Sequence, residues 1–454
     1  MEEAEDEPLF CERAAGIDIG KSMVMVTVRV PSEARKGGRA QETREFGTTR
    51  RHLLELADWL RSWRVERAGM ESTSDYWKPV FFLLEQQGLE CVLYQASKVR
   101  AQPGRPKTDK LDSAWLAKVT ERGSVAGSFV PPEDVRRLRA HTRYRRRLTQ
   151  ARTAEKQRVE KLLEDAHLKL SSVISDVHGV SGAEMLRAIA AGERSPRVLA
   201  EMARGVMRRK LAALREALDC SFFTGEHAFV LSMMLDNIDH YSAQIAALDE
   251  KIAVMCEPYE RQVAQLDQIP GFGVKNAQDL IGEIGVDMSA FPTAGHLCSR
   301  ARVAPRPRES GGRRKGGSAT GKGNPYIGAT LGEASVSAGR TQTFLGAKLR
   351  RLSKRMPKKK AQVAVMRTQL VAAHALLSDP EAAYAEFGPG TTTSAPAPPG
   401  RPAVTSAAWS ASATRSPSSP STPAPENSPP RPANPARPRN PTAQTAAGCC
   451  RLPG

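Results

Sequence analysis

The chain has 454 residues and is 40% hydrophobic, which is enough for two or three domains with cores of their own. Its formal net charge of +18 indicates a polyanionic partner, and DNA or RNA is the first candidate. The alternative is a basic protein that has no specific nucleic-acid function. No stretch approaches the ~20 apolar residues of a membrane span, and the acidic residues 1–7 exclude a signal peptide. Seven cysteines without zinc spacing are typical of a reducing cytoplasm, so we expect a cytoplasmic protein.

The first part of the chain, residues 14–125, reads as alternating strands and helices. Turn residues such as Gly20, Lys21 and Gly37 separate β-rich segments, and amphipathic stretches follow them. Strands come first and α/β alternation follows, which is the layout of a ribonuclease-H-like sheet. The expected strands are 15–19, 23–30, 41–46, 68–71 and 91–94, and the expected helices are 52–63, 76–87 and 109–122.

Four acidic residues stand at the ends of these elements: Asp18, Glu71, Asp109 and Asp112. Asp109 and Asp112 are three residues apart, so they share one face of their helix. Taken singly, each has an ordinary explanation, such as a salt bridge or a charged first helical turn. Together they could converge on two divalent metals that hold the reacting oxygens of a phosphodiester. Carboxylate oxygens favour Mg²⁺ or Mn²⁺ over zinc.

The middle of the chain, residues 133–262, is charged and helix-forming. An arginine-rich helix is expected over 133–168, and a long helical pattern resumes over 200–262. Two long helices joined by a smaller insert fit this pattern. They could form a coiled-coil arm or a dimerisation stalk, or equally a plain solvated helical bundle.

A second compact unit is expected over residues 266–390. It begins with a glycine-containing turn before the helix 276–284, which resembles a helix-hairpin-helix motif. Such glycines let the backbone approach a phosphate, and the helix start presents free amides. We therefore expect sequence-independent DNA contacts from Gly271, Gly273 and Lys275, against the alternative of a plain turn between packed helices.

A basic, glycine-rich loop over residues 304–317 carries one serine at its centre, Ser310. Arg308, Arg313 and Arg314 flank it, and such a setting can bind a phosphate and stabilise charge at an attacked phosphorus. No neighbouring base for the serine is identifiable, so the residues alone favour a phosphate-contacting loop over a nucleophile. Lys107 and Lys110 are further candidate phosphate contacts, with a surface role as an equal alternative, and Lys322 is another candidate nucleic-acid contact.

The composition changes sharply at Thr391. Residues 391–454 hold 15 of the 32 prolines and one acid, Glu426, so a disordered tail is expected. A dispensable extension explains this tail better than nucleic-acid contact through its arginines.

Several motifs in this order resemble the Piv/MooV-type transposases and DNA invertases, the insertion-sequence family one-ten. The resemblance covers about residues 14–390, and the set is specific although no single motif is. Its motifs are Gly16–Asp18, Met70–Thr73, Lys107–Asp112, Phe129–Pro132, Ile269–Gly273, Glu309–Gly312, Lys322–Asn324 and Tyr384–Pro389.

The resemblance implies a RuvC-like catalytic domain at 14–125, a helical coiled-coil region at 133–262 and a C-terminal transposase domain at 266–390. It assigns the catalytic acids to Asp18, Glu71, Asp109 and Asp112, and a functional serine to Ser310, which reverses the preference drawn from the loop alone. The implied reaction is DNA cutting and rejoining through a covalent DNA–serine link, with Mg²⁺ or Mn²⁺ as cofactor.

The resemblance also implies partners. These are double-stranded DNA at the element ends and target, a noncoding guide RNA from the element itself, and further copies of the chain as a dimer or tetramer. Two other functions stay open at this point. One is a RuvC-like junction-resolving nuclease that uses water, and the other is a catalytically dead DNA-binding remnant.

Overall fold

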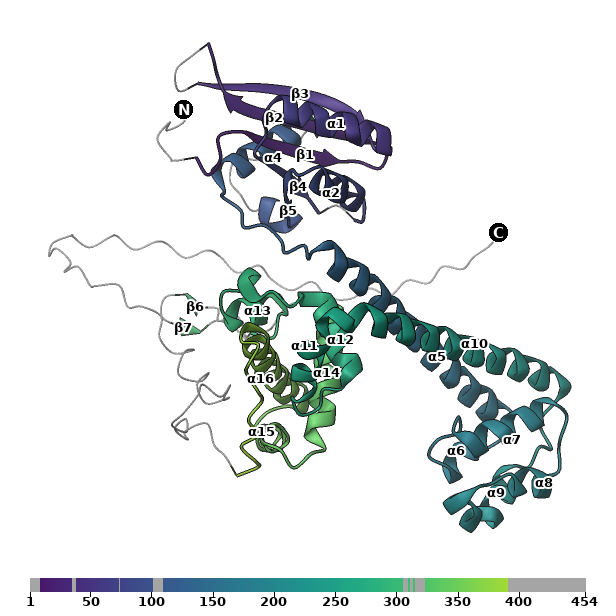
Figure 1. The fold of residues 1–454 in the computed structure, drawn as a ribbon. Coiled ribbons are helices and arrows are strands. Elements are labelled where there is room, and N and C mark those ends of the chain that lie inside the picture. The colour runs from purple at the N-terminus through teal and green to yellow at the C-terminus, as the bar shows by residue number, and fades with distance from the viewer. Residues whose placement is uncertain are drawn as a thin grey trace, which may run out of the picture.

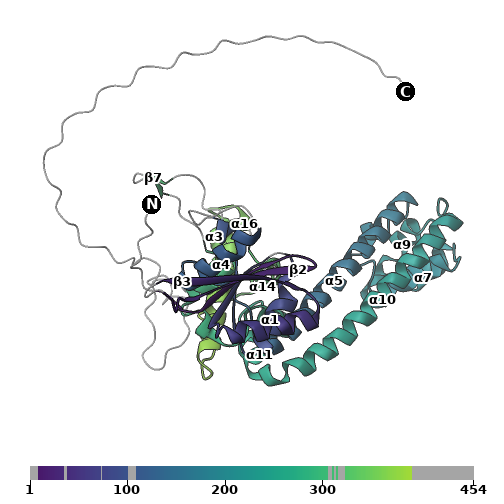
Figure 2. The ribbon, with the colours of Figure 1, turned by 90° about the horizontal axis from the view of Figure 1, so that it is seen from above.

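The computed structural model of the chain is shown in Figures 1 and 2. A sheet domain lies above a helical C-terminal domain, and a pair of long helices extends away from both. The residues that the structure describes are 9–34, 38–72, 74–100, 109–304, 309–310, 313–314 and 323–390.

The N-terminal domain is built on a five-stranded mixed sheet with the order β3-β2-β1-β4-β5. β2 pairs antiparallel with β1 and with β3, whereas β4 pairs parallel with β1 and with β5. The expected mixed α/β domain is therefore confirmed, with each strand within a few residues of its predicted position. The strands are β1 (Ala14–Ile19), β2 (Met23–Pro31), β3 (Arg39–Gly47), β4 (Arg67–Glu71) and β5 (Glu90–Tyr94).

Helices cover both faces of this sheet. On one face, α1 (Arg50–Ser62) and α2 (Trp77–Gln86) pack leucines and phenylalanines against apolar strand residues such as Ile17 and Met70. On the other face lies α4 (Asp109–Arg122), which contacts β1, β2 and β4. A short helix before it, α3 (Ala96–Arg100), was not expected from the sequence.

Two long helices, α5 (Glu133–Asp165) and α10 (Gly225–Cys256), lie side by side along much of their length (Figure 1). Between them in sequence comes an insert of short helices that packs at their far end around its own apolar cluster. A mostly helical middle region is thus confirmed, while its behaviour as a coiled coil stays a prediction. The insert consists of α6 (Leu170–Val173), α7 (Val180–Ala190), α8 (Pro196–Glu201), the 3₁₀ turn Gly205–Lys210 and α9 (Leu211–Ala217).

The long helical pattern expected over residues 200–262 is divided in the structure between several helices. Leu211 and Leu214 belong to the short helix α9, and the long helix begins only after Thr224. Thr224 caps that helix, because its side chain accepts a hydrogen bond from the backbone N–H of His227 and the His227 ring reaches back to its N–H. The apolar period of the sequence continues across this cap, although the helix does not.

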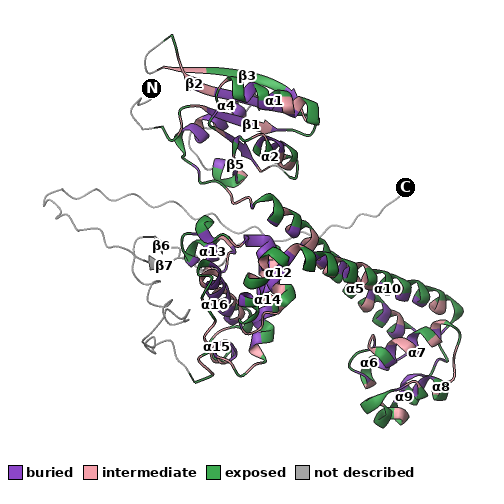
Figure 3. Cartoon of the chain, in the orientation of Figure 1, coloured by how far each residue is buried: buried purple, intermediate pink, exposed green. Residues whose placement is uncertain are grey.

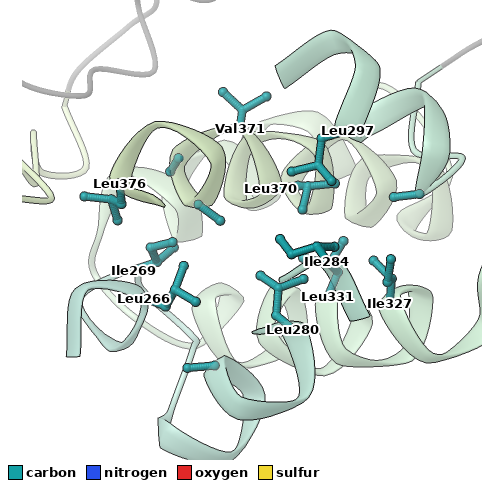
Figure 4. Close-up of a cluster of buried hydrophobic side chains, with 14 of the residues drawn as sticks. Leu266, Ile269, Leu280, Ile284, Leu297, Ile327, Leu331, Leu370, Val371 and Leu376 are labelled. Carbon is teal, nitrogen blue, oxygen red and sulfur yellow. The ribbon is translucent and has the colours of Figure 1, made fainter. Parts of the chain in front are cut away.

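The C-terminal domain is a bundle of helices around one apolar core (Figure 4). Leu266, Leu280 and Leu331 come from different helices and point toward the same centre as Leu370. Figure 3 shows the buried residues gathered on the inner sides of these helices. The helices are α11 (Glu260–Asp267), α12 (Val274–Ile284), α13 (Ala294–Arg300), α14 (Pro325–Gly339), α15 (Phe344–Ser353) and α16 (Lys358–Ser378), with 3₁₀ turns at Glu257–Tyr259 and Met288–Ala290.

No helix in the described part of the chain is long and apolar enough to cross a membrane.

The turn between α11 and α12 is fixed by its packing on α14. Gly271 has φ +90°, and a Cβ placed there would lie 2.1 Å from the carbonyl oxygen of Ala334. The close approach that this glycine permits is therefore to a helix of the same domain. Gly273, by contrast, has φ −148° and open space around it. The predicted phosphate contacts of this turn stay predictions.

Gly271→Ala is expected to lower the free energy of unfolding by about 2 kcal/mol or more, because it adds left-handed backbone strain and a clash with α14. Gly273→Ala is the matched control and should change it by less than about 1 kcal/mol. Urea denaturation of the full chain followed by circular dichroism measures both. Equal effects at the two positions would contradict the packing role of Gly271.

Candidate functional site

Two of the predicted catalytic acids lie at the same edge of the sheet. β1 and β4 are parallel neighbours, and their register pairs Ile17 with Met70. Asp18 and Glu71 are the next residues along each strand, so they come side by side at the carboxyl ends of the two strands. Asp18 is half-buried, and Glu71 is only 8% exposed.

Alternation along the strands directs both acids to the face that α4 covers. A Cβ at Gly16 would lie 2.2 Å from the carbonyl oxygen of Ser113, so α4 rests directly on β1 there. A Cβ at Gly69 would lie 2.0 Å from the side-chain oxygen of Thr120, further along the same helix. Since side chains two residues apart share a face, Asp18 and Glu71 face this helix as well.

The first turn of α4 lies toward the acidic edge. Glu121, near the end of the helix, pairs with Arg29, which is opposite Ala14 at the start of β1. Ser113 lies against Gly16, two residues further along this strand, so the earlier residues of α4 continue toward its carboxyl end. Asp112 is half-buried in this turn. Ser113 fixes the turn on the sheet, because its hydroxyl lies 2.8 Å from that of Thr27 in the protein interior.

The backbones of the predicted acids come to one edge of the sheet, but their described side chains do not form a metal-ligand set. Asp109 is the first residue of α4, but its side chain lies outside the described part of the chain. Among the described side chains, no three His, Cys, Asp or Glu residues come close enough together to hold a metal ion. The donor chemistry fits a hard cation, since all four residues offer carboxylate oxygens. Metal binding by Asp18, Glu71, Asp109 and Asp112 stays a prediction.

The predicted serine lies in a short antiparallel strand pair. β6 (Glu309–Ser310) pairs with β7 (Arg313–Arg314), and Ser310 is opposite Arg313. The backbone therefore places a cationic residue across from the serine. Of the other predicted contacts, Lys107, Arg308 and Lys322 lie outside the described residues, as do the side chains of Lys110, Arg313 and Arg314 and that of Ser310 itself.

The described residues on either side of this serine-bearing segment lie against each other. A Cβ at Gly323 would lie 2.8 Å from the carbonyl oxygen of Ala301 and 2.7 Å from the Cγ of Arg302. The chain thus enters the segment after α13 and leaves it before α14 at the same point. We call this contact of Ala301, Arg302 and Gly323 the loop base.

A buried carboxylate that the sequence analysis missed, Glu283 on α12, fixes the loop base. Its side chain is 2% exposed and accepts hydrogen bonds from Arg143 at 2.6 and 2.9 Å. It also accepts one from the side-chain amide of Asn324 at 2.6 Å. Asn324 in turn caps α14 by accepting from the backbone N–H groups of Tyr326 and Ile327. Glu283 therefore ties α5 to the residue directly after Gly323.

Other arginines of α5 are also neutralised inside the protein. Arg145 is 6% exposed and pairs with Asp279 at 2.6 Å and Asp249 at 2.9 Å. Arg146 pairs with Glu333 at 2.7 Å. Burial lowers the pKa of Arg139 to about 10, which still leaves it charged at neutral pH. The arginine-rich run thus serves to join α5 to α10, α12 and α14.

Lys275, a predicted nucleic-acid contact, belongs to the same network. Its ammonium group lies 2.6 Å from a carboxylate oxygen of Asp249, although two thirds of its side chain is exposed. Burial of Asp249 raises the pKa of its carboxyl group, but hydrogen bonds from Lys275 and Arg145 outweigh this effect and hold the pKa below its ordinary value. Lys275 is therefore paired within the protein, and its contact with nucleic acid stays a prediction.

A linker connects the acidic edge to the loop base. Ser128 forms a β-bridge with Leu93, which lies in β5 beside β4. The next residue, Phe129, lies under the guanidinium group of Arg300 at 4.9 Å, and Arg300 donates a hydrogen bond to its carbonyl oxygen. Arg300 ends α13, directly before the loop base. The two halves of the candidate site are thus joined through the linker.

Glu283→Gln is expected to lower the free energy of unfolding by about 2–4 kcal/mol, because it leaves the partly buried Arg143 and Arg139 without their counter-charge. Arg137→Gln is the control, since Arg137 forms an exposed pair with Glu133 one helical turn away that contributes less than about 0.5 kcal/mol. Thermal unfolding by calorimetry compares the two. A loss at Glu283 no larger than that at Arg137 would contradict the role of this carboxylate.

The sequence matches two transposase family models. Residues 15–168 match the DEDD transposase model of IS110, and residues 263–349 match the model of the IS116/IS110/IS902 transposases. The chain is 41% identical over 86 residues to the pilin gene-inverting proteins of Moraxella bovis and Moraxella lacunata. That stretch is 18% of this chain and spans only about a quarter, 26%, of each relative.

Among solved structures, RuvC of T. thermophilus in complex with a Holliday junction substrate is similar to 24% of this chain, over 90% of its own length. The identity is 12% and the TM-score 0.18. The family rests on the sequence matches instead, which cover both the sheet domain with its acidic edge and the helical domain up to α15. On these matches, the chain belongs to the IS110 family of transposases.

Proposed function

We propose that this chain is a transposase or site-specific recombinase that cuts DNA and rejoins the ends. The observation that carries the proposal is the arrangement of Asp18, Glu71 and the first turn of α4 at one edge of the sheet. The strand order β3-β2-β1-β4-β5, with β2 antiparallel, supports a ribonuclease-H-like or RuvC-like nuclease domain. The family membership supports the choice of DNA transposition over other phosphodiester chemistry.

In this proposal, Asp18, Glu71, Asp109 and Asp112 hold Mg²⁺ or Mn²⁺. When bound, these ions would stabilise charge on the attacking and leaving oxygens of the phosphodiester. The chain's own contribution is to hold four carboxylates at a fixed spacing, with two on strand ends and two on one face of α4.

Ser310 is the proposed nucleophile. Its hydroxyl oxygen forms a bond to phosphorus and the bond from phosphorus to one DNA oxygen breaks, so that the serine proton ends on the released DNA hydroxyl. In the second step, a hydroxyl from another DNA end attacks the same phosphorus and the proton returns to serine. Arg308, Arg313 and Arg314 would neutralise the phosphate oxygens during both steps.

The proposed partners are those of a recombinase of this type. Duplex DNA would meet Lys107, Lys110, Lys322 and the α11–α12 turn with Gly271, Gly273 and Lys275. A noncoding guide RNA from the element itself would select the site, and a homodimer or homotetramer would pair two DNA ends. The long helices α5 and α10 are a natural place for subunit contact, because they extend beyond both domains (Figure 2).

Ser310→Ala is expected to abolish strand exchange and the covalent DNA–protein adduct, because no other group supplies the linking oxygen. The adduct is detected on denaturing gels with end-labelled element DNA and full-length protein in Mg²⁺. The control is Ser353→Ala, on an exposed serine at the end of α15. Full cleavage by Ser310→Ala would instead favour a junction-resolving nuclease that uses water.

Asp18→Asn is expected to reduce cleavage by about 10³-fold or more while DNA binding is retained, since one metal ligand and its charge are lost. The same gel assay, with a filter-binding measurement beside it, separates the two effects. If every DNA-dependent activity survived Asp18→Asn, the acidic edge would have no catalytic role and a DNA-binding remnant would be the better description.

A further inference from the structure

The C-terminal domain contains a stretch of strongly one-sided charge. Between Glu333 and Asp379 the chain has ten lysines and arginines and no aspartate or glutamate. This stretch forms the end of α14, all of α15 and all of α16 up to its last residue. Within the described residues, no salt bridge neutralises any of these ten cations, in contrast to the paired arginines of α5.

Three of these cations are partly buried next to one another. Lys348 of α15 donates a hydrogen bond to the hydroxyl of Thr368 on α16 at 2.8 Å and lies 5.7 Å from the centre of the Phe344 ring. Arg351 and Arg367 are close enough to act on it electrostatically. The Nε of Arg367 is buried and has no hydrogen-bond partner. We call Lys348, Arg351 and Arg367 the cation cluster.

The surroundings of the cluster make its positive charge unfavourable in the free protein. Burial, with the like charges of Arg351 and Arg367, lowers the pKa of Lys348 to about 8. Partly buried charges are normally paired or hydrogen-bonded, and those without a counter-charge reduce stability. A bound anion would supply the missing counter-charge.

We propose that the cation cluster binds the phosphodiester backbone of a nucleic acid. Exposed cations continue from the cluster toward the start of α16 at Lys358, Lys359 and Lys360. That first turn contains no acid, and Pro357 before it provides no side-chain cap. Three lysines at a helix N-terminus are unfavourable without an anion, because the helix dipole is positive there.

The cation cluster and the lysines at the start of α16 together span enough of the helix to contact more than one phosphate. Lys360 and Arg367 are seven residues apart on α16, so they share one face of the helix and lie about 10 Å apart along its axis. A duplex rises by about 3.4 Å per base pair, so several phosphates fall within this length. Charge contacts of this kind carry no sequence preference, and they position the nucleic acid.

The cluster shares no residue with the acidic edge or with β6, which contains Ser310, and it lies beside the helix that leads to the serine. Cys298 of α13 donates a weak hydrogen bond to the carbonyl oxygen of Arg367 at 4.0 Å. α13 ends at Arg300, directly before the loop base. A backbone held by the cluster would therefore pass close to the loop base. Only this last consequence rests on the proposed function.

The test is a salt titration of binding with the full chain in EDTA, so that no cleavage occurs. The probes are a labelled 30-base-pair duplex DNA and a duplex RNA of the same length. Arg351→Gln combined with Arg367→Gln should weaken binding at least tenfold and lower the slope of log K against log salt by about two, because two phosphate contacts are lost. Lys161→Gln, an exposed charge on α5, is the control and should change the slope by less than half a unit.

A loss on both probes, or on only one of them, supports the site and identifies which nucleic acid it holds. An unchanged slope on both probes overturns it. The melting temperature of the free double variant provides a second readout: it should equal or exceed that of the wild type, because like charges are removed, and a clear fall would show a structural role instead. If the wild type bound neither probe, the proposed function would fail rather than this site alone.

Discussion

The carboxylate of Glu283 is the contact on which the arrangement of the C-terminal half depends. It is almost fully buried, and it accepts hydrogen bonds from Arg143 of α5 and from Asn324 at the start of α14. A buried carboxylate requires such partners, and buried arginines require such a carboxylate. The long helix, the core of the helical domain and the loop base are thus held in one network, and the loss of its carboxylate would leave Arg143 without its counter-charge.

This network separates two uses of positive charge in one chain. Arginines of α5 form salt bridges with Asp249, Asp279 and Glu283, so much of the positive charge of this helix is neutralised within the protein. On α15 and α16 no acid is available in the sequence, and the cations remain uncompensated within the described residues. The net charge of +18 therefore includes arginines of α5 that are paired inside the protein and cations of α15 and α16 that no salt bridge pairs within the described residues. Counting arginines alone could not make this distinction, because Asp249, Asp279 and Glu283 are over a hundred residues away from the arginines with which they pair.

The sheet was predictable because its signals are local. Alternating apolar residues and glycine turns predict β1 to β5, and the placement of Asp18 and Glu71 at strand ends follows from those strands. The insert between the long helices was not predictable in detail, since its short helices share an apolar period with α10 and only the Thr224 cap separates them. Glu283 was missed for another reason: in sequence it is one of two acids in an amphipathic helix, and its importance comes from Arg143, 140 residues away.

The two glycines under α4 have a consequence for how the acidic edge could change. Gly16 and Gly69 let the helix rest on the strands with no side chain between them. The distance from the acids of α4 to the acids of the strands therefore depends on the absence of a side chain at Gly16 and Gly69. A methyl group at either position would lift the helix and separate the carboxylates without altering any of them. The spacing of the acids can thus be lost through residues that carry no functional group at all.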